Sequence, residues 1–457
     1  MAELVRTREI SAAELVRMHL EQIERVNPAI NAVVDLLAET ALASAREADE
    51  KLAAGESCGP LHGVPFSVKD SIDVRGTKST AGTLGRKNIA PADRDATLAG
   101  RLRAAGGIPI AKTNLPDLLF SFETDNLIYG RTNNPYDARR SPGGSSGGES
   151  ALIASCGSPL GLGSDALGSV RVPAAFCGIA SIKPTSGRLP RTGHVPPAGN
   201  WVERVWQIGP MARHVEDLVL AMRLLAYPDG EDLTVPPVPL FDAGQMADLR
   251  VAFFTDNGYA HCSEPVRAAV ARCAQFLSGF GMQVDEATPP GVENAYELEL
   301  ALLGADGAAG IDAYLRHHAS TDVHPFTARF VDHMRPHETS VSGLAERWSQ
   351  WEEYRRNLNR FFHGYDIVLC PVYSQVALEH GGSQKESNFE GFSYTMAWSV
   401  AGLPAATVRV GESEGLPVNV QVVANAWQDL TALAVCRLLE TEFDGWQMPP
   451  LLSGRHE

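Results

Sequence analysis

The sequence predicts a mixed α/β protein in which helices pack against a sheet. Segments with apolar residues at helical spacing alternate along the chain with short apolar segments that are typical of strands. The chain also holds 42 Gly and 29 Pro, which supply the turns that such an alternation needs. No internal repeat or low-complexity segment is visible, so a repeat architecture is not expected.

Local signals place the elements in order. Ser11 and Glu14 form a capping box at the start of a helix that Pro28 is expected to end. From about residue 55 to 190 the chain changes to loops rich in Gly, Ser, Thr and Pro, where functional residues tend to concentrate. The predicted helices are residues 11–27, 36–54, 95–106, 215–225, 264–277, 344–362 and 429–439, and the predicted strands are residues 108–111, 249–254, 283–287, 367–370, 405–410 and 418–423.

Charge and composition limit the classes of function. The 457 residues carry 39 Lys and Arg against 55 Asp and Glu, a formal net charge of −16, so direct binding of nucleic acid is not expected. No apolar run approaches the roughly 20 residues that span a bilayer. Residues 1–31 are typical of a charged amphipathic helix rather than a signal peptide, which predicts a cytoplasmic location. Length alone allows two or three domains.

Metal and nucleotide motifs are missing or incomplete. The seven cysteines include no Cys-x-x-Cys pair, and there is no His-Glu-x-x-His. Residues 106–113 are similar to a phosphate-binding loop, but Ala111 replaces its second glycine. Residues 161–166 match the loose dinucleotide pattern, yet the acidic residue that should follow about 20 positions later is absent. We therefore expect no metal and no cofactor.

One serine motif has two interpretations. Residues 143–147 satisfy the Gly-x-Ser-x-Gly pattern, which would make Ser145 the nucleophile of an α/β-hydrolase. Such a nucleophile needs a buried strand directly before it, whereas residues 133–142 are polar and turn-forming. The context therefore speaks against this assignment, and the serine needs another explanation.

Three separated motifs resemble the amidase signature family. They are residues 63–70 (Gly-Val-Pro-Phe-Ser-Val-Lys-Asp), 141–149 (Ser-Pro-Gly-Gly-Ser-Ser-Gly-Gly-Glu) and 163–173 (Gly-Ser-Asp-Ala-Leu-Gly-Ser-Val-Arg-Val-Pro). The resemblance covers about residues 9–227 and 366–442, with further matches at residues 112–114, 134–135, 177–178, 183–185, 209–213, 402–405 and 416–421. Within the family, the chain looks closer to fatty acid amide hydrolases, aryl acylamidases and urethanases than to the tRNA-linked amidotransferases.

The resemblance implies a single domain, residues 1–457, with the amidase signature fold. In that fold a central twisted mixed sheet is covered by helices. The expected parts are N-terminal helices over residues 1–60, the signature core over 61–227, a mainly helical insertion on the substrate side over 230–365, and the C-terminal part of the core sheet over 366–457.

The family's catalytic triad carries over to Lys69, Ser145 and Ser169. Ser169 would be the nucleophile, and a serine hydroxyl needs a base to remove its proton. The resemblance implies that this base is a buried, neutral Lys69, which acts through the hydroxyl of Ser145 at a cis peptide bond. Asp165 and Arg171, which flank the nucleophile, are expected to pair and hold its loop.

The same resemblance implies an oxyanion hole and a substrate pocket. The backbone N–H groups of Ala166, Leu167, Gly168 and Ser169 match the family's oxyanion-hole loop. Leu167 departs from the family, which usually has a small residue there. Its branched side chain would either narrow the acyl pocket, and so change substrate preference, or point into the core. The expected substrate-binding residues are Leu119, Trp201 and Trp206.

Three functions follow from these residues. The first is a serine hydrolase that cleaves a small-molecule amide, aryl amide or carbamate with an apolar or aromatic flank. The second is the catalytic component of an amidotransferase complex, which releases ammonia from glutamine or asparagine. The third is a catalytically inactive scaffold on the same fold. For the first function, the only protein partner considered is a second copy of the chain, in a homodimer.

Overall fold

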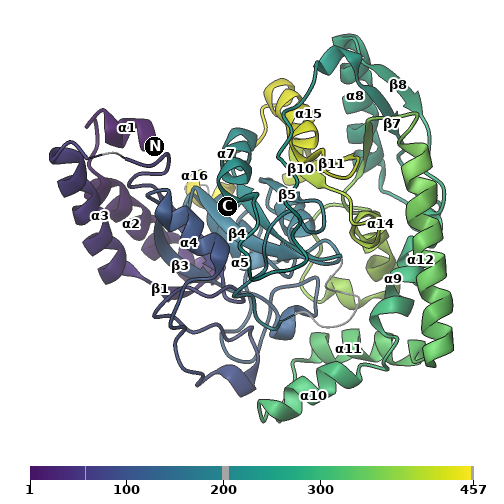
Figure 1. Ribbon diagram of the computed structural model, residues 1–457, viewed down its shortest axis with the longest axis horizontal. Helices are drawn as coiled ribbons and strands as arrows, with labels where there is room; N and C mark the ends of the chain where they lie inside the picture. Colours follow the sequence, from purple (N-terminus) through teal and green to yellow (C-terminus); the bar gives the residue numbers. More distant parts are fainter. Residues whose placement is uncertain (57, 198–204, 454–457) are drawn as a thin grey trace.

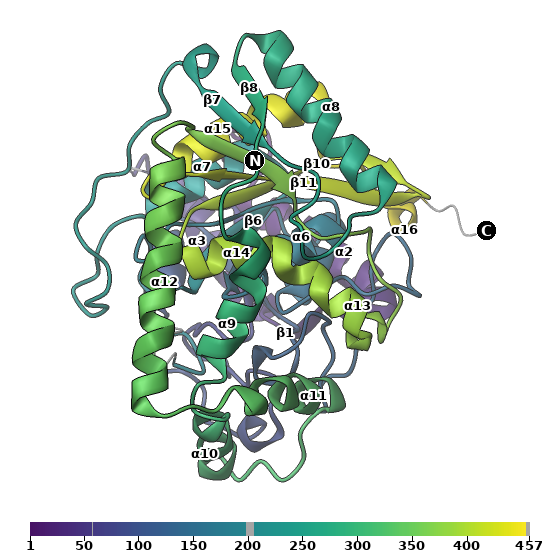
Figure 2. The ribbon, with the colours of Figure 1, turned by 90° about the vertical axis from the view of Figure 1, so that its right-hand side faces the viewer.

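The computed structural model describes residues 1–56, 58–197 and 205–453, and one sheet of 11 strands runs through it (Figures 1 and 2). The strand order is β1-β3-β2-β4-β6-β5-β10-β11-β9-β7-β8. The strands are β1 (Val33–Leu36), β2 (Pro65–Lys69), β3 (Ile108–Thr113), β4 (Leu160–Asp165), β5 (Ala180–Lys183), β6 (Gln207–Ala212), β7 (Arg250–Phe253), β8 (Gln283–Glu286), β9 (Ile367–Pro371), β10 (Ala405–Ser413) and β11 (Leu416–Ala424).

The sheet is mixed, and strands from the N-terminal and C-terminal parts of the chain pair at its centre. β2 runs parallel to β3 and β4, whereas β4, β6 and β5 are antiparallel neighbours. The hairpin of β10 and β11 pairs with β5 through the antiparallel register Ala405↔Lys183 to Thr407↔Ser181. This pairing brings residues more than 200 positions apart into one sheet, as the predicted α/β fold requires.

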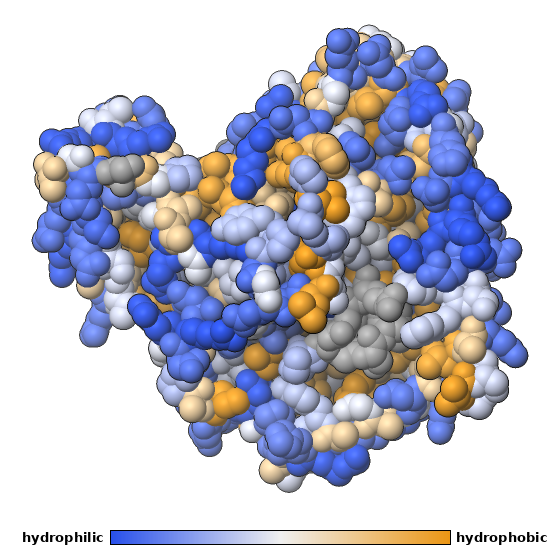
Figure 3. All heavy atoms as spheres, viewed as in Figure 1, coloured by the Kyte–Doolittle hydropathy of each residue, from blue (hydrophilic) through white to orange (hydrophobic). Residues whose placement is uncertain are grey.

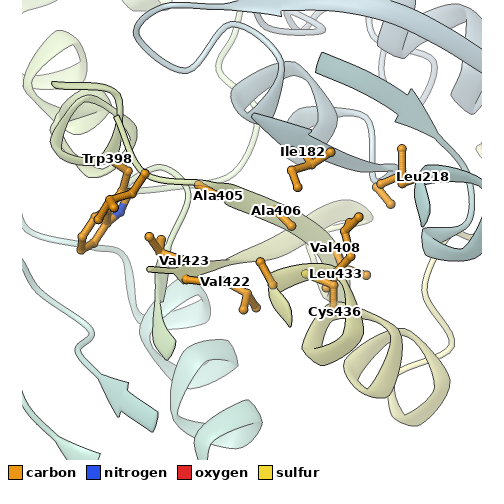
Figure 4. Packing of buried hydrophobic residues seen from close by; sticks show 14 of the residues in the cluster. Ile182, Leu218, Trp398, Ala405, Ala406, Val408, Val422, Val423, Leu433 and Cys436 are labelled. Atoms are coloured by element: carbon orange, nitrogen blue, oxygen red, sulfur yellow. The ribbon is translucent and has the colours of Figure 1, made fainter. Parts of the chain in front are cut away.

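Helices cover the sheet. α6, α8 and α15 pack against β10 and β11, α7 packs against β5 and β6, and α2 packs against α3 beside β1 and β3. Ile182, Ala406, Val408 and Leu433 belong to the main hydrophobic cluster between these layers (Figure 4). The helices are α1 (Ala2–Arg6), α2 (Ala12–Ile30), α3 (Ala38–Ala53), α4 (Thr97–Ala104), α5 (Gly147–Ala154), α6 (Arg171–Phe176), α7 (Val215–Leu225), α8 (Glu264–Phe280), α9 (Ala295–Leu303), α10 (Ala309–His317), α11 (Pro325–Met334), α12 (Val341–Phe361), α13 (Glu386–Phe389), α14 (Ser393–Ala401), α15 (Asp429–Glu442) and α16 (Pro450–Ser453).

The first long helix begins as predicted and ends later than predicted. Ser11 Oγ accepts a hydrogen bond from the backbone N–H of Glu14 at 3.1 Å, and the Glu14 carboxylate accepts one from the N–H of Ser11 at 2.9 Å. Pro28 lies inside α2 rather than beyond its end. A proline inside a helix removes one backbone N–H donor, and in the last turn of α2 this loss does not end the helix. Asn31, in the left-handed conformation with φ 48°, ends it instead.

Part of residues 230–365, which the family resemblance assigns to an insertion, belongs to the core sheet. β7 and β8 form at the predicted positions, but β7 pairs with β9 and so extends the central sheet. α8 packs against β9, β10 and β11, whereas α9 to α12 lie on the side of the molecule that faces the viewer in Figure 2. The separate helical part of this range therefore begins after β8.

The face of the molecule in Figure 3 carries both hydrophilic and apolar residues. On the face in Figure 3, hydrophilic residues cover α3 and α12, and apolar residues are scattered between them. Within residues 1–56, 58–197 and 205–453, no helix has both the length and the apolar character needed to cross a bilayer.

Candidate active site

The candidate site lies where β2 and β4 end. β2 ends at Lys69 and β4 ends at Asp165, and because the two strands are parallel neighbours, their carboxyl ends lie at the same edge of the sheet. A cavity of about 310 Å³ opens there. Its lining residues are Leu118, Leu119, Phe120, Ser121, Phe122, Ser145, Ser164, Asp165, Ala166, Leu167, Ser169, His194, Pro196, Pro197, Val205, Trp206, Glu299, Leu303, Asp306, Gly310, Ile311, Tyr314 and Phe330.

Lys69 is a buried amine whose hydrogen-bond partners are neutral groups. Its side chain is fully buried, and Nζ lies 2.7 Å from Ser145 Oγ, 3.2 Å from Ser164 Oγ and 3.4 Å from the Ser164 carbonyl oxygen. Burial lowers the pKa of Lys69 to about 7, although the nearby charges of Asp165 and Glu149 act in the opposite direction. A substantial fraction of Lys69 is therefore neutral at neutral pH.

Ser145 lies in the loop before α5. The Gly144–Ser145 peptide bond is cis, as the family resemblance implies. Gly143, one residue earlier, adopts φ 82°, and a Cβ atom there would lie 2.8 Å from Pro173 Cα, so this position favours glycine. The loop holds the Ser145 hydroxyl against Lys69.

Ser169 lies in the loop between β4 and α6 and is the most accessible of the three predicted residues. Its exposed fraction is 9%, compared with 1% for Ser145 and 0% for Lys69. Its carbonyl oxygen accepts a hydrogen bond from the N–H of Ser146 at 3.0 Å, which joins the two serine loops. The structure therefore places all three residues at one end of the sheet, with Ser145 and Ser169 bordering one cavity.

A buried ion pair fixes the Ser169 loop, as predicted. Asp165 Oδ2 lies 2.9 Å from Arg171 Nε, and both side chains are fully buried. Although burial alone would raise the pKa of Asp165, the charge of Arg171 holds it below its usual value. Arg171 also donates hydrogen bonds to Ser399 Oγ at 2.7 Å and to the Thr395 carbonyl oxygen at 3.0 Å. The loop is therefore anchored to α14.

The predicted set of four oxyanion-hole amides needs a correction at Gly168. Its N–H donates to Asp165 Oδ1 at 2.7 Å, so this amide is already used inside the loop. Among the described residues, no hydrogen bond is formed by the N–H groups of Ala166, Leu167 or Ser169. These three amides remain available to a ligand.

The loop accepts the branched side chain of Leu167 because the positive φ angle lies at the neighbouring Gly168. Gly168, not Leu167, has a positive φ of 133°, and a Cβ atom at Gly168 would lie 2.3 Å from Thr395 Oγ1. Thr395 donates its hydroxyl proton to the Leu167 carbonyl oxygen at 2.7 Å. The Leu167 side chain contributes to the cavity wall and packs against an aromatic cluster that includes Phe122.

Two of the three predicted substrate-binding residues line the cavity. Leu119 borders it from a short 3₁₀ helix, Asp117–Leu119, and Trp206 also borders it. The Trp206 ring lies 4.3 Å from the His194 ring, measured between centroids. Trp201 lies outside the described residues.

The sequence motifs missed several residues of the site. His194 lies outside the motifs and contacts Ser164 beside Lys69. Leu303, Ile311 and other residues of the segment 299–330 form one wall of the cavity. No local sequence motif marks the residues of this wall, because their position depends on how α9 to α11 pack over the edge of the sheet. Of the described cavity-lining residues, none comes from α12.

No metal cluster is visible in the parts of the chain that the structure describes. There, no group of three or more His, Cys, Asp or Glu residues is arranged to hold an ion.

A buried carboxylate, Glu149, lies near Lys69 and accepts hydrogen bonds from Thr113 Oγ1 at 2.6 Å and from Ser67 Oγ. Burial raises the pKa of Glu149 to about 7, and its two hydroxyl partners hold it in place.

Comparison with known proteins agrees with this geometry. Residues 14–433 match the sequence profile of the Amidase family. The chain is 31% identical over 481 residues to fatty-acid amide hydrolase 2-A of Danio rerio, covering 98% of this chain and 89% of that protein. It is 30% identical over 473 residues to a glutamyl-tRNA(Gln) amidotransferase component of Synechococcus sp. (strain JA-2-3B'a(2-13)), covering 97% of this chain and 92% of that protein.

A solved structure of a hydrolase has the same fold. The structure of 6-aminohexanoate cyclic dimer hydrolase complexed with substrate superposes with a TM-score of 0.87 and 27% sequence identity, and it covers 99% of this chain and 98% of that one. The hydrolase and amidotransferase relatives match at similar identity, so identity alone does not separate them. Family, fold and neighbouring hydrolases together indicate hydrolysis of amide carbon–nitrogen bonds. The chain therefore belongs to the amidase signature family and is an amide hydrolase.

Proposed function

We propose that the chain cleaves amide, aryl amide or carbamate bonds of small, largely apolar or aromatic substrates through an acyl-enzyme on Ser169. One observation carries this proposal. A buried lysine amine, with its pKa lowered to about 7, lies 2.7 Å from the Ser145 hydroxyl at the cavity that Ser169 also borders. This arrangement suits a serine nucleophile with a lysine base.

The attack step forms one bond and transfers two protons along the relay, which leaves one additional proton on Lys69. Ser169 Oγ attacks the substrate carbonyl carbon as its proton passes to Ser145 Oγ, and Ser145 passes its own proton to neutral Lys69. The resulting Lys69 ammonium has three N–H donors, which match the three oxygens of Ser145 and Ser164 around it. Return of the proton to the leaving nitrogen breaks the C–N bond, and water then hydrolyses the acyl-enzyme by the same route.

The negative charge of the tetrahedral intermediate needs hydrogen-bond donors. Ala166, Leu167 and Ser169 border the cavity, and their N–H groups, which form no hydrogen bond among the described residues, are suited to this task. The N–H of Gly168 keeps its bond to Asp165. Amides that point at the developing oxyanion stabilise the transition state more than the substrate. The ion pair of Asp165 and Arg171 supports the loop that carries them.

The cavity wall supports an apolar substrate. Leu119, Trp206, Leu303, Ile311 and Phe330 present apolar surface around the reacting serines. A cavity of about 310 Å³ is at the small end of the range for ligand sites, which favours a compact amide or carbamate.

The catalytic component of an amidotransferase is the second candidate, because a relative with that name matches 97% of the chain at 30% identity. A glutamine or asparagine substrate would need several polar groups, whereas apolar side chains dominate this cavity wall. Glutaminase activity that appears only when a second protein co-purifies would favour this candidate.

The proposal is tested with a fluorophosphonate probe, which reacts with activated serines. We expect the native protein to form one adduct, which peptide mass spectrometry places on Ser169, and we expect Lys69→Met to reduce the labelling rate strongly. The same preparation should hydrolyse chromogenic anilides and aryl carbamates. An unlabelled Ser169 in folded protein, together with no turnover of either substrate class, would favour the inactive scaffold.

Leu167 is expected to set the size of the acyl group. Leu167→Gly removes a side chain from the cavity wall and should raise kcat/KM for a bulky acyl anilide relative to its acetyl analogue by roughly tenfold. Leu167→Met, which keeps the volume, serves as the control and should leave this ratio unchanged. An unchanged ratio in Leu167→Gly would place the acyl group elsewhere in the cavity.

A further inference from the structure

We propose that His194 is a positioning residue, which fixes the direction of the hydrogen bond between Ser145 and Lys69 by holding the hydroxyl proton of Ser164. The inference rests on the proposed function of Lys69 as base. It assigns a task to a histidine that lies outside all three sequence motifs.

The His194 ring has polar contacts on both of its nitrogens. Nδ1 lies 3.2 Å from the carbonyl oxygen of Pro196, and Nε2 lies 3.0 Å from Ser164 Oγ and 3.1 Å from Ser71 Oγ. An isolated bridge between His194 and Ile72 ties the backbone to the segment that follows β2. The ring is held at the cavity wall, beside Trp206.

These contacts define the tautomer. A carbonyl oxygen can only accept, so Nδ1 carries the proton and donates it to Pro196. Burial, followed by the nearby charge of Lys69, lowers the pKa of His194 to about 3, so the ring is neutral at any pH near neutrality. Nε2 is consequently an acceptor, and the hydroxyl of Ser164 donates to it.

The orientation of Ser164 then decides the orientation of Lys69. With its proton directed to His194, Ser164 Oγ offers only lone pairs to Lys69 Nζ at 3.2 Å, and the Ser164 carbonyl oxygen at 3.4 Å also only accepts. A neutral amine has two N–H donors and one lone pair. Both donors are taken by Ser164, and the lone pair is left for Ser145 Oγ at 2.7 Å.

The consequence is a hydrogen bond that runs in the productive direction. Ser145 must donate its proton to Lys69, which is the direction in which the base removes it, and its own lone pairs are left free to accept a proton. Without the acceptor on His194, the Ser164 hydroxyl could instead donate to the lone pair of Lys69. Lys69 would then be blocked as a base for part of the time.

Ser71 competes for the same acceptor. Nε2 has a single lone pair, and the hydroxyls of Ser71 and Ser164 lie at nearly equal distances from it. Among the described residues, the Ser71 hydroxyl forms no hydrogen bond to Lys69 and does not line the cavity, so its removal leaves His194 entirely to Ser164. Ser71→Ala is therefore a matched control, whose kcat should stay within about twofold of the native value.

The test compares His194→Leu, which removes the acceptor, with His194→Gln, whose side-chain oxygen can accept in its place. We expect His194→Leu to lower kcat on a chromogenic anilide roughly 10- to 100-fold with an unchanged KM, as is typical when a hydrogen-bond partner behind a reactive group is lost. His194→Gln should recover most of this kcat. Ser164→Ala should lower kcat to a similar extent, and combining it with His194→Leu should add little.

Several results would overturn the inference. Equal losses in the Leu and Gln variants would indicate packing, a raised KM at native kcat would indicate a substrate contact, and additive losses with Ser164→Ala would separate the two residues. If His194→Leu does not fold, the comparison of His194→Gln, Ser164→Ala and their double variant decides by the same rule. Failure of the proposed function looks different, since native Ser169 would then not react with fluorophosphonate and Ser169→Ala would keep its activity.

Discussion

Replacing Ser169 with alanine is expected to lower kcat for anilide hydrolysis roughly 10⁴-fold or more, because no acyl-enzyme can form without its hydroxyl. The residual rate would come from substrate binding and the amides of the Ser169 loop. The fold should be retained, since the Ser169 hydroxyl forms no hydrogen bond within the described parts of the chain and the residue is 9% exposed. The measurements are kcat, KM and the thermal midpoint Tm.

A second serine provides the control for this loss. Ser158 is also buried, and its hydroxyl donates to the Leu160 carbonyl oxygen at 2.8 Å, but it does not line the cavity. Ser158→Ala should keep native kcat, and its Tm measures the loss of stability caused by removing a buried hydroxyl. Equal activity in the native protein and Ser169→Ala would remove Ser169 from the chemistry.

The second large effect is expected from Lys69→Met, which replaces the base by an apolar side chain of similar length. We expect kcat to fall roughly 10³-fold or more. In the native protein only the neutral amine is a base, so kcat/KM should rise with pH through the pKa of Lys69, about 7, and then level off. This rise should be absent from the residual activity of Lys69→Met.

Lys69→Met should also be more stable than the native protein. The unfolded chain holds the Lys69 proton up to its ordinary pKa of 10.5, whereas the folded protein releases it at about 7. The unfolded state therefore binds more protons between these values, and the free energy of unfolding rises with pH across this window. At pH 7 the burial of this amine costs up to about 5 kcal/mol, on the scale of 1.36 kcal/mol per pKa unit. Calorimetry at pH 7 and pH 9 measures the difference.

Lys183 is the matched control for Lys69→Met. It is also fully buried, and burial lowers its pKa to about 7, with the charge of Arg171 acting in the same direction. Its Nζ donates to the Pro184 carbonyl oxygen at 3.1 Å and does not line the cavity. Like Lys69→Met, Lys183→Met should raise the free energy of unfolding, but it should keep the native pH profile of kcat/KM. Loss of that profile in Lys183→Met would mean that the profile does not report Lys69.

The candidate catalytic residues could be predicted because their surroundings are local in the sequence. Ser145 and Ser169 each lie in a glycine-containing run, and backbone conformations such as φ 82° at Gly143 and 133° at Gly168 favour glycine at those positions. The ion pair of Asp165 and Arg171 spans only six residues. Short-range constraints of this kind leave a mark in the sequence.

Strands in the signature core were harder to predict. β4 has the sequence Leu-Gly-Leu-Gly-Ser-Asp and β6 contains Gly and Pro, which are residues with low strand propensity, yet both strands are fully buried. Their pairing partners decide their structure, because β4 lies between β2 and β6. Tertiary contacts override local propensity there.

The sequence by itself determined the mixed α/β class, the family resemblance and the choice of Lys69, Ser145 and Ser169 as candidates, because these follow from periodicity and contiguous motifs. Only the tertiary structure decided that β7 and β8 extend the central sheet, that Gly168 uses its amide within the loop, and that His194 lies behind Lys69. Ser164 and His194 are 30 residues apart, and their contact forms only when β4 and the segment after β5 meet at the sheet edge. Contacts of that kind depend on packing in three dimensions, for which a single sequence carries no local signal.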